Sequence, residues 1–219
     1  MVDQVRLPPP SELDLPIGEA MFTQRAIRKF KPDPISDEQL KLILDAASKA
    51  PSGGNYPFAR FLVIRDSARI QAFGALYREA WWAKRREGPG WTKIEDIPET
   101  EKTYLAAAGL AEEMARAPVV VLAFAVLRGD LGHSVLPAVQ NLLLAARALG
   151  IGTTLTTLHE DVMPRVMEMF DIPDTAQFYC CIPMGYPRGK FGTTARLPTS
   201  ETTFWDGWEQ PPPWQRAEL

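Results

Sequence analysis

Residues 24–66 have the sequence QRAIRKFKPDPISDEQLKLILDAASKAPSGGNYPFARFLVIRD, in which a basic cluster, a helix, a turn-rich loop and a strand follow one another. Ser36 and Gln39 have the spacing of a capping box, in which each side chain accepts a hydrogen bond from the other residue's backbone N–H. Apolar residues then recur at helical spacing, which predicts an amphipathic helix over 37–49. Pro51 ends this helix, since the residue before a proline disfavours the helical conformation.

Helical and strand-like segments alternate irregularly along the rest of the chain. Helices are predicted over 67–87, 101–116, 134–149 and 161–170, and strands over 61–66, 118–126, 151–158 and 176–187. Gly150 follows the most apolar of these helices and is expected to provide its left-handed C-cap. This order of elements predicts an α+β fold in which helices surround a central, mostly antiparallel or mixed sheet.

Length and composition limit the classes of protein to which the chain can belong. Its 219 residues suffice for a single domain, 1–219, with a sizeable core. The net charge of -3 argues against a general nucleic-acid-binding protein. The longest apolar run, 118–127, has about half of the ~20 residues that a membrane-spanning helix needs. Because Cys180 and Cys181 are adjacent, a disulfide between them is disfavoured, and we expect a soluble, cytoplasmic protein that binds neither nucleic acid nor membranes.

Few residues in the sequence are suited to metal or nucleophilic chemistry. His133 and His159 are the only histidines, and neither has the spacing of a two-ligand metal site. The motifs of serine and cysteine nucleophiles and of glycine-rich phosphate loops are not found either. We therefore expect no metal, and we interpret both histidines as structural.

Two groups of residues are suited to binding an anion or a planar polar ligand. Arg25 and Arg28 are three residues apart, so if they begin a helical turn they project on one side of it. Guanidinium groups placed in this way can grip a phosphate. For two arginines alone, ion pairing with surface carboxylates is the more common arrangement. Ser52, Gly53 and Asn55 form a small-residue loop that either lets a planar ligand approach the backbone or is an ordinary turn.

In combination, these motifs resemble the opening of the nitroreductase family, flavoenzymes that bind FMN. In that family a basic segment, a capped helix, an A-P-S/T-x-x-N loop and a strand occur in the order found over 24–66. The resemblance continues in AVQNLLLAARALGIGTTLTTL, IPMGYP and ARLPTSETTFWDGW. It extends over nearly the whole chain and is weakest over 70–105.

The resemblance implies an FMN site that is built from several segments. Arg25 and Arg28 match basic positions that contact the phosphate, ribityl chain and pyrimidine edge of FMN. Gln24 and Ala26 depart from the family, which often has arginine and serine at these positions, so phosphate binding would depend on Arg25 and later cations. The cofactor-binding residues implied in this way are Arg25, Ala26, Arg28, Ser52, Gly53, Asn55, Gln140, Leu155, Thr156, Thr157, Lys190 and Arg196.

The family also implies roles for some of these residues. Asn55 matches the asparagine that hydrogen-bonds the flavin pyrimidine, and Gln140 lies on the central helix where a polar side chain often approaches the cofactor. The segment 155–157 passes the flavin, with Thr157 as a possible donor to flavin N5. No catalytic residue is implied, because the flavin itself carries the redox chemistry.

Three further regions are expected: an N-terminal arm over 1–20, a lid over 70–105 and a C-terminal extension over 191–219. Trp81, Trp82 and Trp91 are expected to form an aromatic wall of the substrate pocket in the lid. The cations Lys84, Arg85 and Arg86 either attract the extra phosphate of NADPH or form a solvated helix face.

Homodimers with two FMN sites at the subunit interface are typical of the family, which implies an intertwined homodimer here. The C-terminal extension is rich in proline and contains Trp205, Trp208 and Trp214. Such a segment is suited to wrapping a neighbouring subunit, where its aromatic side chains become buried. Packing on its own subunit is the alternative.

The function implied by the resemblance is that of an FMN-dependent oxidoreductase with a ping-pong mechanism. Hydride would pass from NADH or NADPH through flavin N5 to a nitroaromatic, a quinone or a similar small electrophile. Reductive deiodination, flavin-fragmenting benzimidazole synthesis and flavin binding without turnover are the alternatives. Deiodination ranks lower, because the Glu, Tyr and Lys set of deiodinase lids is not recognisable in 70–105.

Overall fold

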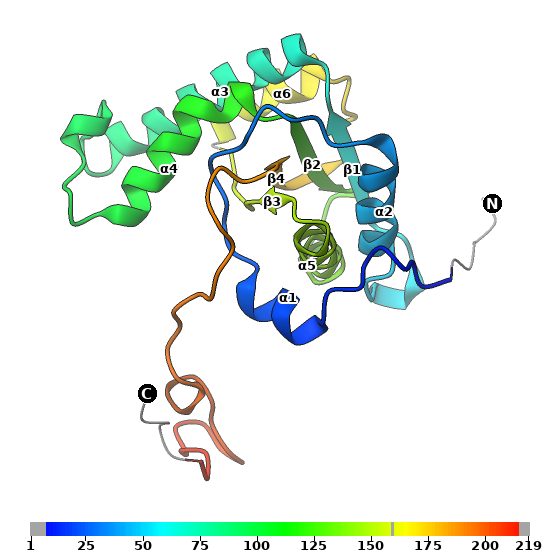
Figure 1. The fold of residues 1–219 in the computed structure, drawn as a ribbon. Helices are drawn as coiled ribbons and strands as arrows, with labels where there is room; N and C mark the ends of the chain where they lie inside the picture. Colours follow the sequence, from blue (N-terminus) through cyan, green and yellow to red (C-terminus); the bar gives the residue numbers. More distant parts are fainter. Residues whose placement is uncertain (1–7, 159, 215–219) are drawn as a thin grey trace.

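The computed structural model describes residues 8–158 and 160–214. Its α+β fold is centred on an antiparallel sheet with the strand order β1-β2-β4-β3 (Figure 1). The strands are β1 (Ala59–Ile64), β2 (Val119–Ala125), β3 (Gly152–Thr153) and β4 (Gln177–Gly185). The predicted fold class, with its mostly antiparallel sheet, is confirmed.

Helices cover both faces of this sheet (Figure 1). In the described part of the chain they are α1 (Ile17–Thr23), α2 (Asp37–Ser48), α3 (Ser67–Glu87), α4 (Lys102–Glu113), α5 (Gly132–Ala148) and α6 (Met163–Met169). Helices α2 and α5 pack on one face, and α3, α4 and α6 pack on the other. None of these described helices is long and apolar enough to cross a membrane.

Successive side chains of β4 point to opposite faces of the sheet, and each face packs into its own half of the core. Cys180, Ile182 and Met184 pack toward α2 and α5, whereas Cys181 packs toward α3 and α6. Both thiols are fully buried and unbridged, and burial raises the pKa of Cys180 to about 12. The two cysteines are therefore packing residues with unreactive thiols.

Local signals placed the helix ends well. The N–H of Gln39 donates to Ser36 Oγ and the N–H of Ser36 donates to Gln39 Oε1, each at 3.2 Å, so the capping box is confirmed. Gly150 has a φ of 72°, and the N–H of Ile151 donates to the carbonyl of Ala146 at 2.8 Å. This confirms the left-handed C-cap that closes α5.

The predicted strand over 151–158 is wrong in its extent. Only Gly152 and Thr153 form a ladder with β4, and Thr156 makes an isolated bridge to Cys181. Leu155, between these contacts, is 43% exposed. The β-propensity of the threonines is outweighed here by tertiary contacts that lead the chain out of the sheet.

Arg25 and Arg28 do not begin a helical turn, which was the condition for their projecting on one side of it. Helix α1 ends at Thr23, and residues 24–31 are extended. The N–H of Ile27 donates to the carbonyl of Thr153 at 2.8 Å, so the segment adds to the edge of the sheet beside β3. These partners are distant in sequence, and a local pattern does not reveal them.

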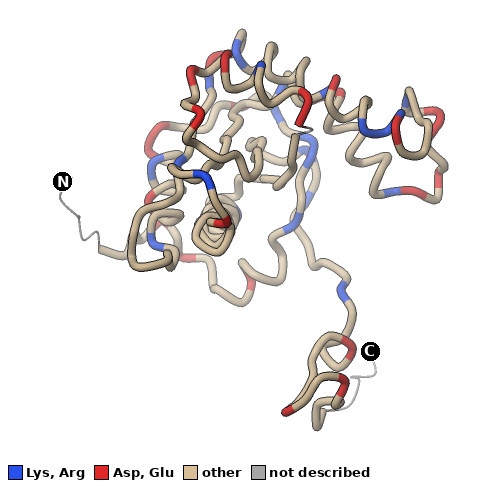
Figure 2. The backbone as a smooth tube through the Cα atoms, turned by 180° about the vertical axis from the view of Figure 1, so that it is seen from behind, with Lys and Arg blue, Asp and Glu red and all other residues tan. Residues whose placement is uncertain are grey.

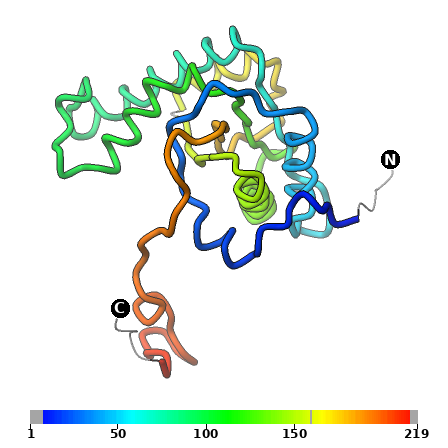
Figure 3. The backbone as a smooth tube through the Cα atoms, viewed as in Figure 1, coloured from blue at the N-terminus to red at the C-terminus, as the bar shows by residue number. Residues whose placement is uncertain are grey.

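Beyond β4 the chain passes segment 24–31 and then leaves the body of the fold, as the orange and red trace in Figure 3 shows. In the described part of this tail the only regular element is a single 3-10 turn, Thr199–Glu201. The predicted N-terminal arm and C-terminal extension both reach outside the described residues, at 1–7 and 215–219. His159 also lies outside them.

Candidate functional site

The opening basic segment is fixed between two parts of the chain that come much later in the sequence. Besides the bond from Ile27 to Thr153, Arg188 Nε donates to the carbonyl of Phe30 at 2.7 Å. Ile27 and Phe30 are buried in the core that contains α3 and α6. Backbone bonds and two apolar anchors thus hold the segment, so its arginine side chains are not needed for its attachment.

Arg25 and Arg28 are neighbouring cations, and no carboxylate within the described ranges pairs with either of them. Burial lowers the pKa of the Arg28 guanidinium, the nearby Tyr77 opposes this change, and the positive charge of Arg25 lowers the pKa further. A half-buried guanidinium with a second cation in its vicinity is a favourable place for an anion, which compensates the charge. The two arginines are therefore suited to a phosphate group.

The segment that carries Lys190 and Arg196 passes close to this pair. A Cβ built on Gly192 would lie 4.0 Å from Arg25 Nη1. Both later cations are exposed, and Figure 2 shows basic positions, in blue, recurring along the chain that leads into the tail. Basic segments from the two ends of the sequence are therefore brought together.

One hydroxyl pair attaches the segment 155–157 to helix α3. Tyr77 OH and Thr156 Oγ1 are 2.8 Å apart. Tyr77 is buried, which raises the pKa of its phenol and keeps it protonated. Thr156 also exchanges backbone hydrogen bonds with Cys181 at 2.9 and 2.8 Å. Leu155 and Thr157, on either side, are exposed and free to face a ligand.

A small cavity lies between α3 and this segment, with a volume of about 120 Å³. The residues that line it are Tyr77, Ala80, Trp81, Lys84, Arg85, Thr156, Thr157 and Leu158. Pockets for whole small molecules usually measure ~300–1,000 Å³, so this cavity has room only for a small group of a ligand. Its charged lining residues are both cations.

The loop 52–55 lies at the other end of the molecule's central helix. The N–H of Gly53 donates to Ser134 Oγ at 3.0 Å, in the first turn of α5. The Ser52 hydroxyl donates to the carbonyl of Tyr56. Asn55 has a φ of 56° and is exposed. The loop therefore presents the Asn55 amide to the surroundings on a firmly held backbone.

In one copy of the chain the two predicted halves of the site are far apart. Ser134 contacts the loop 52–55, whereas Arg147, near the other end of α5, donates to Thr23 Oγ1 at 2.9 Å beside the basic segment. Along a helix, the rise from Ser134 to Arg147 is ~20 Å. Gln140 is exposed between them. A single chain therefore does not bring the loop and the opening arginines together.

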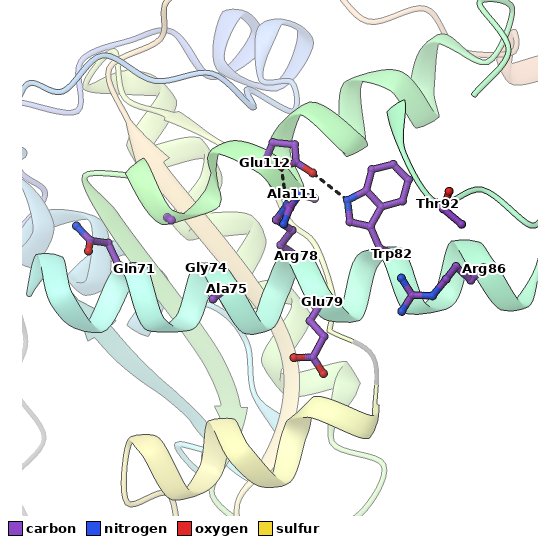
Figure 4. Close-up of a pocket in the computed structure, with 11 residues that line it drawn as sticks. Gln71, Gly74, Ala75, Arg78, Glu79, Trp82, Arg86, Thr92, Ala111 and Glu112 are labelled. Carbon is purple, nitrogen blue, oxygen red and sulfur yellow. Dashed lines mark hydrogen bonds and ion pairs between the residues drawn. The ribbon is translucent and has the colours of Figure 1, made fainter. Parts of the chain in front are cut away.

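The three lid tryptophans have different surroundings. Trp81 lines the small cavity. Trp82 is buried, and its Nε1 donates to Glu112 at 2.9 Å, while Arg78 Nε donates to the same carboxylate at 2.6 Å (Figure 4). This pair borders a larger hollow, about 560 Å³, between α3 and α4, to which none of the predicted flavin residues belongs. Trp91 is half-buried against α4.

Tyr77 belongs to this site, and the sequence reasoning did not identify it. A signal for it does exist, because Tyr77, Trp81 and Arg85 recur at every fourth position and so share one face of α3. All three residues lie within the predicted helix 67–87, so this shared face could have been found from the sequence. What the sequence does not show is the Thr156 hydroxyl that Tyr77 contacts.

Comparison with known proteins places the chain among flavoproteins. A family model described as "Nitroreductase family" matches residues 22–186. A Thermus thermophilus protein named NADH dehydrogenase is 28% identical over 217 residues, which cover 89% of this chain and 99% of that protein. A Rhodospirillum rubrum protein named 5,6-dimethylbenzimidazole synthase is 28% identical over 178 residues, 78% of this chain and 82% of that protein.

Solved structures agree with these matches. A Desulfovibrio desulfuricans structure in complex with FMN has a TM-score of 0.67 and 26% identity, with 88% of this chain and 98% of that chain covered. Iodotyrosine deiodinase bound to FMN and 3-iodo-L-tyrosine has the same TM-score of 0.67 at 22% identity, with 82% and 94% covered. The second likeness is one of fold alone.

Proposed function

Because the chain belongs to the nitroreductase family, we propose that it is an FMN-dependent oxidoreductase that passes hydride from NADH or NADPH to a small electrophile such as a nitroaromatic or a quinone. The observation that carries this proposal is the Arg25–Arg28 pair, which has no carboxylate partner in the described part of the chain and adjoins Tyr77 and the exposed segment 155–157. Such a surface is suited to a ligand that has both an anionic group, next to the arginines, and a flat polar ring system, next to the segment 155–157.

In the proposed complex, Arg25 would hold the FMN phosphate with Lys190 and Arg196 nearby, and Arg28 would hold the ribityl chain and pyrimidine edge. FMN, when bound, supplies the redox chemistry. Thr157 would donate a hydrogen bond to the bound flavin near N5, and the cations would favour its anionic reduced state electrostatically. The Tyr77–Thr156 hydrogen bond holds the segment that carries this donor in place.

We further propose that the site is completed by a second copy of the chain. The loop 52–55 lies ~20 Å from the opening arginines along α5, so its Asn55 would reach the pyrimidine of a flavin held by the partner. Ile17, Met21 and Phe22 on α1 are 68%, 59% and 74% exposed, and Leu136 on α5 is 47% exposed. An exposed apolar surface of this kind is typical of an interface.

Flavin retention tests the proposed phosphate site. We expect Arg25→Ala to purify with most of its FMN lost, since a phosphate contact of this kind is charge-assisted. Lys29→Ala is the matched control, because Lys29 is an exposed cation of the same segment, and it should keep its flavin. A full flavin complement in Arg25→Ala, measured by absorbance after denaturation, would show that the phosphate binds elsewhere.

Anaerobic stopped-flow tests the proposed reaction. Mixing the flavoprotein with NADH or NADPH should bleach the flavin absorbance, and adding a nitroaromatic or a quinone should restore it. A bound flavin that neither nicotinamide reduces would instead favour flavin-fragmenting benzimidazole synthesis. That alternative is kept because a relative named as such a synthase is 28% identical to this chain.

A further inference from the structure

Arg85 lies on the face of α3 that borders the small cavity, one helical turn beyond Trp81 and two beyond Tyr77. Its guanidinium carbon is 5.2 Å from the centre of the Trp81 ring and 5.1 Å from that of the Tyr104 ring. The N–H groups of Gly90 and Trp91 donate to its carbonyl at 3.0 and 3.2 Å. Both the backbone and the side chain of this arginine are therefore held in place.

The side chain of Arg85 is also incompletely satisfied. Its Nε is buried and has no hydrogen-bond partner within the described residues, and no carboxylate of those residues forms an ion pair with it. A guanidinium carries five N–H donors, and a buried donor without a partner costs free energy. On a solvated helix face, by contrast, water accepts hydrogen bonds from the side-chain donors of lysine and arginine.

Positive charge is concentrated around the cavity. Lys84 lines it beside Arg85, and Arg28 is close enough to Tyr77 to affect the pKa of its phenol. Among the described residues, no aspartate or glutamate lines the cavity. Two cations therefore line a small space next to the segment 155–157, and no described lining residue balances their charge.

From this geometry we infer that Arg85, with Lys84, binds a carboxylate or a similar small oxyanion on the electron acceptor. The inference rests on the proposed function and narrows it to acceptors that carry an acidic group next to the reducible ring. Arg85 and Thr157 line the same small cavity. The anionic group of the acceptor would therefore be separated from the reducible group, next to Thr157, by no more than one ring. The aromatic faces of Trp81 and Tyr104 hold the guanidinium in position for it.

The other source of an oxyanion is the 2′-phosphate of NADPH. Two riboses and a pyrophosphate separate that phosphate from the nicotinamide ring. A nicotinamide stacked on the flavin beside Thr157 would place its 2′-phosphate well outside a cavity of about 120 Å³. The carboxylate of a compact acceptor can lie inside the cavity while the acceptor's ring is beside Thr157. We therefore assign the anion bound by Arg85 to the acceptor and not to NADPH.

Equilibrium binding to the oxidised flavoprotein tests the inference without turnover. Isothermal titration calorimetry would compare 4-nitrobenzoate with its uncharged analogue 4-nitrobenzamide. We expect 4-nitrobenzoate to bind ~10–100-fold more tightly, as charge-assisted hydrogen bonds to a partly buried guanidinium do. Equal affinities for the two probes in the unaltered protein would overturn the inference.

Variants locate the effect. Arg85→Met keeps an unbranched side chain between the two rings, and it should remove most of the preference for 4-nitrobenzoate while leaving the affinity for 4-nitrobenzamide within about threefold. Arg86→Gln is the matched control: Arg86 is the next cation along α3, but it borders the larger hollow in Figure 4. It should leave both affinities unchanged. Lys84→Gln provides a second test if Arg85→Met does not fold.

Steady-state kinetics separate the possible results. If Arg85→Met raises KM for NADPH but not for NADH, and leaves 4-nitrobenzoate binding unchanged, the subsite belongs to the nicotinamide phosphate and the inference is wrong. If neither NADH nor NADPH reduces the unaltered flavoprotein, the proposed function is contradicted instead. The carboxylate preference in binding would still be measurable in that case, so the two failures are distinguishable.

Discussion

The two tryptophan groups of this chain, one in the lid and one in the tail, have opposite environments. Trp82 in α3 is 6% exposed and bonded to Glu112, whereas Trp208 in the tail is 82% exposed. In the tail the rings pack mainly on one another, with Phe204 and Trp208 centred 4.6 Å apart and Trp205 and Trp214 centred 5.3 Å apart. The lid group packs against the helices of the fold, whereas the tail rings contact one another and remain largely exposed.

This difference indicates what each region needs in order to be stable. The lid tryptophans add to a core that α3 and α4 already form. The tail leaves the body of the fold (Figure 1) and exposes aromatic surface that water disfavours. We therefore interpret the tail as the part of the chain that packs on a partner subunit, which agrees with the composite site proposed above.

Replacing a lid tryptophan should have the largest effect on the stability of the chain. Trp82→Ala removes a buried ring and leaves Glu112 with one donor fewer, so we expect the free energy of unfolding to fall by ~3–5 kcal/mol. Urea denaturation measures this change. Trp208→Ala is the matched control and should have little effect on the same quantity in a dilute, monomeric sample, and an equal loss in both variants would contradict the distinction between the two groups.

Removing the aromatic side chains of the tail should act on association rather than on the fold. A variant with Trp205, Trp208 and Trp214 all changed to alanine should dimerise at least ~10-fold more weakly, because buried tryptophans are typical interface hot spots. Sedimentation velocity over a range of protein concentrations measures the dimer dissociation constant. An unchanged constant would show that the tail packs elsewhere.

A pair of glycines tests how tightly the lid helices pack. A Cβ at Gly74 in α3 would lie 2.5 Å from the Cα of Ala115, whereas one at Gly109 in α4 would have no heavy atom within 4 Å. Gly74→Ala should therefore destabilise by ~1–3 kcal/mol, since backbone must move. Gly109→Ala should stabilise by up to ~1 kcal/mol through helix propensity. Thermal denaturation of the two variants should show changes of opposite sign.

The smallest expected effect concerns Asp96, in the loop beside Trp91. Hydrogen bonds from the Thr92 N–H and hydroxyl, and then from Lys93 N–H, lower the pKa of this carboxyl. A carboxyl whose pKa is lowered by folding stabilises the folded state at any pH above its unfolded-state pKa, near 3.8. This stabilisation is lost as the pH falls through the pKa of the folded state.

Amide exchange over residues 92–97 would detect this effect. Exchange in the unaltered protein should approach that of Asp96→Asn as the pH is lowered toward 3, and should be slower by a few-fold at pH 6. A constant ratio of the two exchange rates across this range would mean that the carboxylate does not hold the loop.

The elements that the sequence predicts well are those whose signals are local. Ser36 and Gln39 are three residues apart, and Gly150 acts within the turn that it caps, so α2 and the end of α5 can be located from the sequence alone. The extended conformation of 24–31 cannot, because Thr153 supplies the bond that pulls this segment into the sheet. A tertiary contact there overrides a pattern that is compatible with a helix.

The candidate site follows the same rule. Arg25 and Asn55 could be identified because their segments have recognisable motifs, but their separation along α5 within one chain is a property of the fold. Tyr77 and Thr156 are 79 positions apart, and no periodicity links a tyrosine on a helix to a threonine on a loop. The missing partner of Arg85 is visible only once burial is known.

The position of segment 24–31 also has a consequence for the order of events during synthesis. The basic segment is made early, yet the groups that hold it, Thr153 and Arg188, are added more than a hundred residues later. Contacts of such long range form late in folding, because large loops must close first. The proposed FMN site would therefore stay incomplete in a nascent chain until Arg188, just beyond β4, has emerged from the ribosome, and flavin capture would then report that the whole domain has folded.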